Sequence, residues 1–184
     1  DLPRTDGPDA SRRAWDLTMD RCVLAPPSVV WAVITDLEGT TVHLPGIVAV
    51  ERLSDDGPGA YGVGTRWRET RRMFGQEAVE EMEVVAADSA RRTVVRAEHG
   101  AVRYVSGFEL LPAGNGTIGP GGGATLLRFR FGAERTGPTS GLRARVGRAL
   151  GALTAPVGIE ATRRAVRTEL EAIAELAERR AADG

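Results

Sequence analysis

The sequence contains no lysine, because all 24 of its basic residues are arginines. This absence excludes a lysine Schiff base and the lysine of a phosphate-binding loop. The single cysteine, Cys22, excludes an intramolecular disulfide, and two histidines, His43 and His99, are too few for a histidine-rich metal site. We therefore expect no metal and no cofactor.

Long apolar runs are also absent, and none approaches the roughly 18 residues that a membrane-spanning helix needs. The 24 basic and 25 acidic residues give a net charge of −1, so no global field favours nucleic acid or an anionic lipid surface. No basic start followed by an apolar stretch indicates a signal peptide. We expect a cytoplasmic protein, and the arginine, alanine and glycine content indicates a bacterial source. The oligomeric state, monomer or homodimer, stays open.

The length of 184 residues favours one domain. Residues 1–12 are polar and rich in proline and glycine, which predicts a disordered tail, and residues 13–181 are expected to form the domain. Alternating apolar residues predict a first strand within 14–25. A short helix should begin at Pro26 or Pro27, and a second, irregular one should lie within 37–46.

Strand patterns dominate from residue 47 onward. They are separated by turn signals at 10–14 residue intervals, which is typical of an antiparallel meander, and they cover 47–54, 62–75, 77–88, 91–100, 101–112 and 124–134. Residues 113–123 read as a long flexible hairpin loop. From about 139 to 181 the period becomes helical, and Pro156 should divide this region into a shorter helix and one of about 25 residues.

This order of elements predicts an α+β fold in which a bent antiparallel sheet of about seven strands wraps around the long C-terminal helix. Only that helix is large enough to cover one face of the sheet. Because a sheet rarely closes perfectly around one helix, we expect a cavity between them.

Several segments carry a family resemblance: 24–53, 62–69, 84–95, 107–117 and the long terminal helix. Together they resemble the SRPBCC superfamily, and within it the polyketide cyclase/dehydrase-like group related to START and Bet v 1 proteins. The resemblance covers about residues 14–180. It implies a helix-grip fold with a deep hydrophobic cavity for lipids, polyketides or other small apolar molecules, in members that range from aromatase/cyclases to carriers.

One predicted strand places charged and apolar side chains on the same face. Alternation puts Trp67, Glu69, Arg71 and Met73 together and turns the intervening arginines toward water. A buried charge needs a partner, so Glu69 and Arg71 should pair with each other or with Glu80 on the next strand, the natural partner for Arg71. Two interpretations stay open: a polar patch that orients a ligand or supplies an acid or base, and a buried ion-pair cluster without chemistry.

The expected cavity would be lined by the inward faces of the strands and by the helix after Pro156. The candidate residues are Trp67, Glu69, Arg71, Met73, Glu80, Met82, Tyr104, Ser106, Phe108, Phe129 and Val157. Tyr104 is interpreted either as a donor to a ligand or as a core residue whose hydroxyl is satisfied. His43, at a helix end near the expected cavity mouth, and His99 are weaker candidates for a general base.

The arginines of the C-terminal helices are interleaved with Glu160, Glu169, Glu171 and other glutamates, which favours a solvated helix face over a nucleic-acid surface. Three functions stay open. The first is a binding protein for a small hydrophobic molecule. The second is a metal-free polyketide cyclase or dehydratase that uses Glu69, Arg71, Glu80 and Tyr104. The third is a partner-binding protein of the same superfamily. No catalytic residue is assigned.

Overall fold

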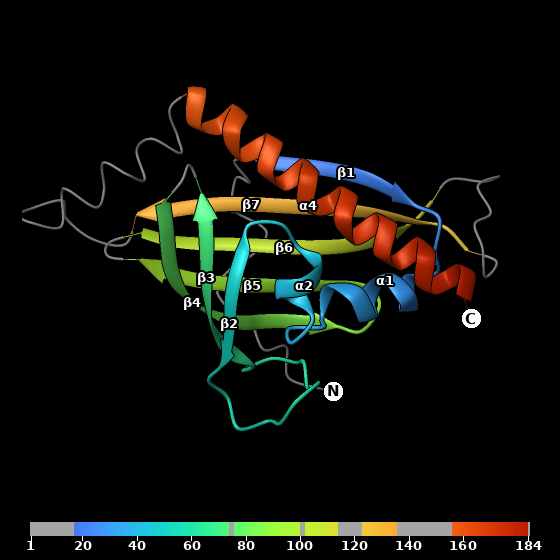
Figure 1. The fold of residues 1–184 in the computed structure, drawn as a ribbon, viewed down its shortest axis with the longest axis horizontal. Helices are drawn as coiled ribbons and strands as arrows, with labels where there is room; N and C mark the ends of the chain where they lie inside the picture. The colour runs from blue at the N-terminus through green and yellow to red at the C-terminus, as the bar shows by residue number, and fades with distance from the viewer. Residues whose placement is uncertain (1–16, 74–75, 100–101, 114–122, 136–155, 184) are drawn as a thin grey trace, which may run out of the picture.

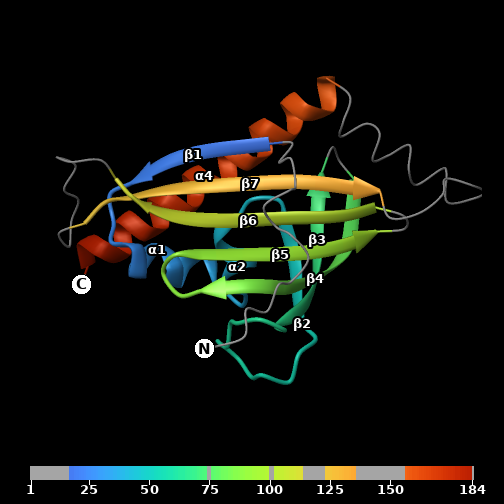
Figure 2. The same cartoon turned by 180° about the vertical axis from the view of Figure 1, so that it is seen from behind.

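A long helix lies across one face of a curved antiparallel sheet (Figures 1 and 2). The computed structural model describes residues 17–73, 76–99, 102–113, 123–135 and 156–183. The elements in chain order are β1 (Leu17–Val23), α1 (Pro27–Ile34), α2 (Thr40–His43), β2 (Ile47–Arg52), β3 (Arg66–Met73), β4 (Gln76–Asp88), β5 (Arg92–His99), β6 (Val102–Pro112), β7 (Thr125–Arg135) and α4 (Pro156–Asp183).

The sheet has the spatial order β1-β7-β6-β5-β4-β3-β2. The strands from β2 to β7 follow one another as a meander, and β1 joins β7 at the far edge. Every pairing is antiparallel. The predicted α+β helix-grip fold, with seven strands and two short helices after the first, is confirmed.

Helix α4 is amphipathic over its second half, and this half fills the core. Leu170, Ile173, Ala174 and Ala177 are buried against α1 and the sheet, with Leu127 of β7 fully buried opposite. Burial of a leucine- or isoleucine-sized side chain contributes about 1.5–3 kcal/mol, so this stripe fixes the position of α4 on the sheet.

The prolines mark element boundaries as expected. Pro27 begins α1, with Pro26 in extended conformation as its N-cap. Pro156 begins α4, a helix of 28 residues. The expected tail at 1–12, most of the 113–123 loop and the helix expected before Pro156 lie outside the described residues.

The alternation predicted for β3 is confirmed by burial. Trp67 and Glu69 are buried, whereas Arg66 and Arg72 on the opposite face are exposed. The inward face of β3 therefore carries a tryptophan, a carboxylate and, at Arg71, a half-buried guanidinium.

Candidate functional site

A network of three charged residues connects β3 to α4. Arg71 Nε donates to Glu69 Oε1, and Arg71 Nη1 donates to Glu169 Oε1 at 2.6 Å. Trp67 Nε1 donates to the second oxygen of Glu69 at 3.2 Å. Glu69 is 4% exposed, whereas the side chain of Arg71 is 31% exposed. The network therefore begins in the core and ends at the surface.

The charges in this network do not balance, because one guanidinium faces two carboxylates. Burial raises the pKa of Glu169; Arg71 opposes that rise, and Glu69 adds to it. Burial by itself would lower the pKa of Arg71, but Glu169 and Glu69 outweigh it and hold this pKa above its ordinary value. Arg71 thus stays charged, while Glu169 is the carboxyl group that accepts a proton more readily than an exposed glutamate.

Two of these three residues, Glu69 and Arg71, were predicted as an inward-facing pair, whereas the prediction for Glu169 was wrong. The placement of Glu169 on a solvated helix face is wrong, because its side chain is only 15% exposed and bonds to Arg71. Of the partners expected for Arg71, Glu69 is confirmed. In the β3–β4 register Glu80 lies opposite Glu69, and Arg71 lies opposite Ala78.

A groove of about 410 Å³ opens beside this network. One wall is formed where β2 begins and β3 ends, and the other by the first half of α4. It is lined by Pro45, Gly46, Arg71, Arg72, Ala161, Arg164, Ala165, Thr168 and Glu169. Its volume lies in the range of about 300–1,000 Å³ that is typical of small-molecule sites.

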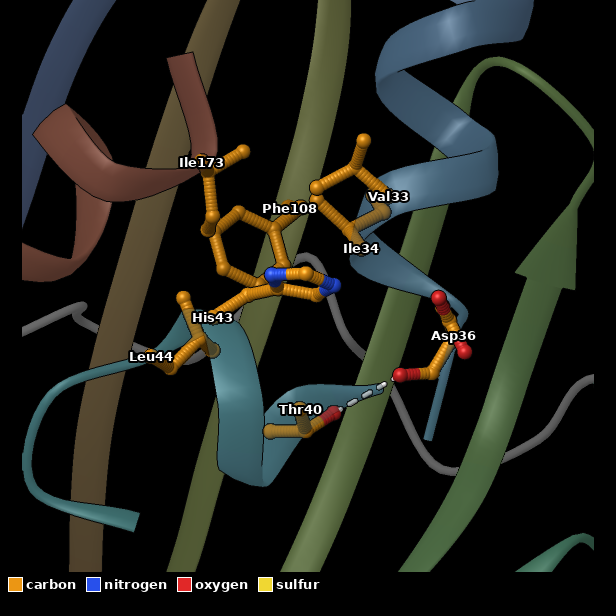
Figure 3. Close-up of a pocket in the computed structure, with 8 residues that line it drawn as sticks. All are labelled: Val33, Ile34, Asp36, Thr40, His43, Leu44, Phe108 and Ile173. Carbon is orange, nitrogen blue, oxygen red and sulfur yellow. Dashed lines mark hydrogen bonds between the residues drawn. The ribbon is translucent and has the colours of Figure 1, made fainter. Parts of the chain in front are cut away.

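A second, much smaller cavity of about 40 Å³ lies between α1, α2, β6 and α4 (Figure 3). It is lined by Val33, Ile34, Asp36, Thr40, His43, Leu44, Phe108 and Ile173. This volume suits one or two water molecules rather than a metabolite. His43 and Leu44 line this cavity and Pro45 and Gly46 line the groove, so the turn between α2 and β2 lies between the two spaces.

His43 is at the end of α2, as expected, and its ring lies beside Phe108 in Figure 3. Thr40 Oγ1 donates to the backbone oxygen of Asp36 at 2.8 Å, which holds α2 against the end of α1. Asp36 and Thr40 could not be identified from the sequence, since neither belongs to an apolar pattern.

Most of the candidate residues lie on the inward face of the sheet but do not line either space. Trp67 and Met82 belong to a second core cluster around Val84, and Phe129 packs against the main core. Ser106 and Glu80 are half-buried. The side chains of Met73, Val157 and His99 lie outside the described residues. Of the eleven candidates, Arg71 lines the groove and Phe108 lines the small cavity.

Tyr104 is 7% exposed and stacks on Phe131 with ring centroids 5.9 Å apart. Within the described part of the chain its buried hydroxyl has no hydrogen-bond partner. Burial, together with the charge of Glu80, raises the pKa of Tyr104. The core interpretation of the ring is confirmed, but the expected satisfaction of the hydroxyl is not.

The described residues hold no group of three or more histidine, cysteine or carboxylate side chains that could bind a metal ion. No helix in the same residues is long and apolar enough to cross a membrane. The groove is the candidate site because it combines a volume of about 410 Å³ with a lining of arginines and one carboxylate.

Comparisons with known proteins agree with this fold. A family model described as polyketide cyclase/dehydrase and lipid transport matches residues 14–178. No curated protein sequence matches the chain.

Among solved structures, the Zhui aromatase/cyclase from Streptomyces sp. R1128 is 20% identical, with a TM-score of 0.65, and the match covers 89% of this chain and 93% of that one. A START superfamily protein from Mycobacterium smegmatis is 16% identical, with a TM-score of 0.52 and coverage of 80% and 97%. Norcoclaurine synthase from Thalictrum flavum is 16% identical, with a TM-score of 0.54 and coverage of 87% and 84%. At these identities the likeness concerns the fold.

Proposed function

Because the chain belongs to the polyketide cyclase/dehydrase and lipid transport family, we propose that it binds a small hydrophobic molecule in the groove between the sheet and α4. The observation that carries this proposal is the groove itself. It has the volume of a ligand site, and it lies where the fold leaves the sheet and the helix apart.

The lining of the groove supports a ligand that is largely apolar but has one polar end. Pro45, Ala161 and Ala165 offer small apolar surfaces, and Arg71 and Glu169 offer a donor and an acceptor side by side. A few polar groups on an apolar wall are the usual means of orienting a small molecule.

The test is saturable binding of a hydrophobic fluorescent probe, followed by native mass spectrometry of the protein purified from its own host. Ala165→Trp places a large side chain in the groove, and because Ala165 is exposed the variant should fold. Ala182→Trp, at another exposed alanine of α4 that does not line the groove, is the matched control. We expect Ala165→Trp to weaken probe binding at least about tenfold and the control to leave it unchanged. Equal affinities in both variants would place the probe elsewhere.

The alternative is an enzyme that cyclises or dehydrates a polyketide-like substrate in the same groove. The raised pKa of Glu169 favours it, since a carboxylate of this kind at a ligand site suits general acid–base work. It would take the proton of a carbon next to a ketone. The resulting enolate would attack a second carbonyl, and the proton would then pass to the new alkoxide.

Under this alternative Glu69, which is almost fully buried and does not line the groove, serves to hold Arg71 in place. Incubation of a model polyketone with the wild type and with Glu169→Gln tests this function. Turnover that is unchanged in the variant would exclude Glu169 as the base.

A further inference from the structure

The wall of the groove that α4 provides carries one arginine, Arg164, that makes no ion pair among the described residues. Arg71 is bonded to Glu69 and Glu169, and Arg72 to Glu77 at 2.7 Å. The guanidinium of Arg164 lines the groove, is exposed and makes no ion pair within the described residues.

The helical period explains why Arg164 faces the groove and its neighbours do not. Ala161, Arg164, Ala165, Thr168 and Glu169 recur at intervals of three and four and form one stripe along α4. Arg163 and Arg167 lie outside this stripe. They are exposed, and they add positive charge near the groove without lining it.

Arg72 also borders the groove, at the end of β3, but its guanidinium lies on the outer face of the strand, where it is paired with Glu77. The side chains of Arg72 and Glu77 are 60% and 50% exposed, so this ion pair is a weak surface pair. The groove thus has Arg164 on the α4 wall, with small apolar residues beside it. Glu169 disfavours a doubly charged ligand, because its carboxylate lines the same groove.

We propose that Arg164 binds the carboxylate of an acidic amphiphile whose apolar part lies on Pro45, Ala161 and Ala165. This inference rests on the proposed function and specifies its ligand class: an apolar monocarboxylic acid, as opposed to a neutral lipid. A guanidinium suits this role because its planar fork donates two parallel hydrogen bonds to a carboxylate.

The experiment compares a dansyl-labelled fatty acid with its methyl ester, which has the same apolar part and no charge. We expect the wild type to bind the acid about three- to tenfold more tightly than the ester, the range for one or two partly exposed charge-assisted bonds. Arg164→Gln should reduce this preference and leave the affinity for the ester unchanged.

Arg163→Gln is the matched control, since it removes the same charge from the adjacent position of the same helix. It should keep the preference within about twofold of the wild type, because a charge screened by solvent acts weakly. Equal binding of acid and ester by the wild type would overturn the inference and leave the proposed function intact. An equal loss of acid preference in Arg163→Gln and Arg164→Gln would also overturn the inference, since it would indicate attraction by the overall positive charge of α4 and not a contact with Arg164. Failure of both probes to bind would overturn the proposed function and this inference with it.

Discussion

Replacement of Arg71 by glutamine tests whether the three-residue network holds β3 and α4 together. The change removes the guanidinium that bonds to both Glu69 and Glu169, and it leaves the carboxylate of Glu69 buried at 4% exposure. A buried charge that loses its partner is strongly destabilising, because the protein offers no water to solvate it.

The expected magnitude follows from the burial of the three side chains. Breaking a buried ion pair costs about 3–5 kcal/mol, and the 31% exposure of Arg71 places this case at the lower end, near 3 kcal/mol. With a urea m-value of about 2 kcal/mol/M, the midpoint of unfolding should fall by roughly 1.5 M. Arg72→Gln is the control: the residue is adjacent, on the outer face, and its exposed pair with Glu77 contributes at most about 1 kcal/mol.

Urea unfolding followed by circular dichroism at pH 5 and pH 7.5 gives a second, independent check. Arg71 is the group that opposes the rise in the pKa of Glu169, so its removal should raise that pKa further. A carboxyl group with a raised folded-state pKa contributes stability below its unfolded value, and this contribution is lost as the pH rises through the folded value. The deficit of Arg71→Gln should therefore be larger at pH 7.5 than at pH 5. A deficit no larger than that of Arg72→Gln, or one independent of pH, would refute the reasoning.

Three further changes test other parts of the structure. Burial raises the pKa of Glu169, so ionisation of this group above about pH 4.3 disfavours the folded state. In urea titrations across pH 4–8, the free energy of unfolding of the wild type should therefore fall relative to that of Glu169→Gln as the pH rises. Tyr104→Phe should change the free energy of unfolding by less than about 0.5 kcal/mol, since the change breaks no hydrogen bond among the described residues. Tyr61→Phe should lower it by about 1 kcal/mol, because it breaks a 2.7 Å hydrogen bond to Thr93. Equal losses in the two variants would contradict this assignment. Hydrogen bonds from two hydroxyl groups and a guanidinium lower the pKa of Asp56 to about 2, so Asp56→Asn should lower the melting temperature at pH 7, and the difference should disappear as the pH falls from about 4 to about 2.

The sequence was sufficient to predict the elements and the inward face of β3, because those depend on local periods. Alternation along the strand places Trp67, Glu69 and Arg71 on one side whatever the rest of the chain does. The partner of Arg71 could not be found in this way. Glu169 is 98 residues away, and no period within a strand or a helix connects two positions so far apart. The local signal concerned burial alone: the positions three and four residues from Glu169 are Ala165, Val166, Ala172 and Ile173, which are all apolar.

The position of the open space could not be predicted either, because it depends on which side chains are small. The rings of Phe108 and Phe129, which were expected to line a large cavity, lie 5.3 Å apart and pack against the main core. Phe108 borders the small cavity of about 40 Å³ and not the groove. The groove forms beside Gly46, Ala161 and Ala165, where the side chains leave the two walls apart. Small residues at helical spacing were the available signal.

Stability alone does not account for the charged network at the edge of this groove. Apolar residues of similar volume often stabilise a core as well as a buried ion pair does, or better. A network retained for packing would also be sealed from solvent, whereas Arg71 is partly exposed and lines the groove. Its bonds to the two glutamates use Nε and Nη1. The glutamates thus hold the guanidinium in a fixed orientation while part of it stays available at the groove wall. This is the arrangement expected of a group that is positioned in advance for a ligand.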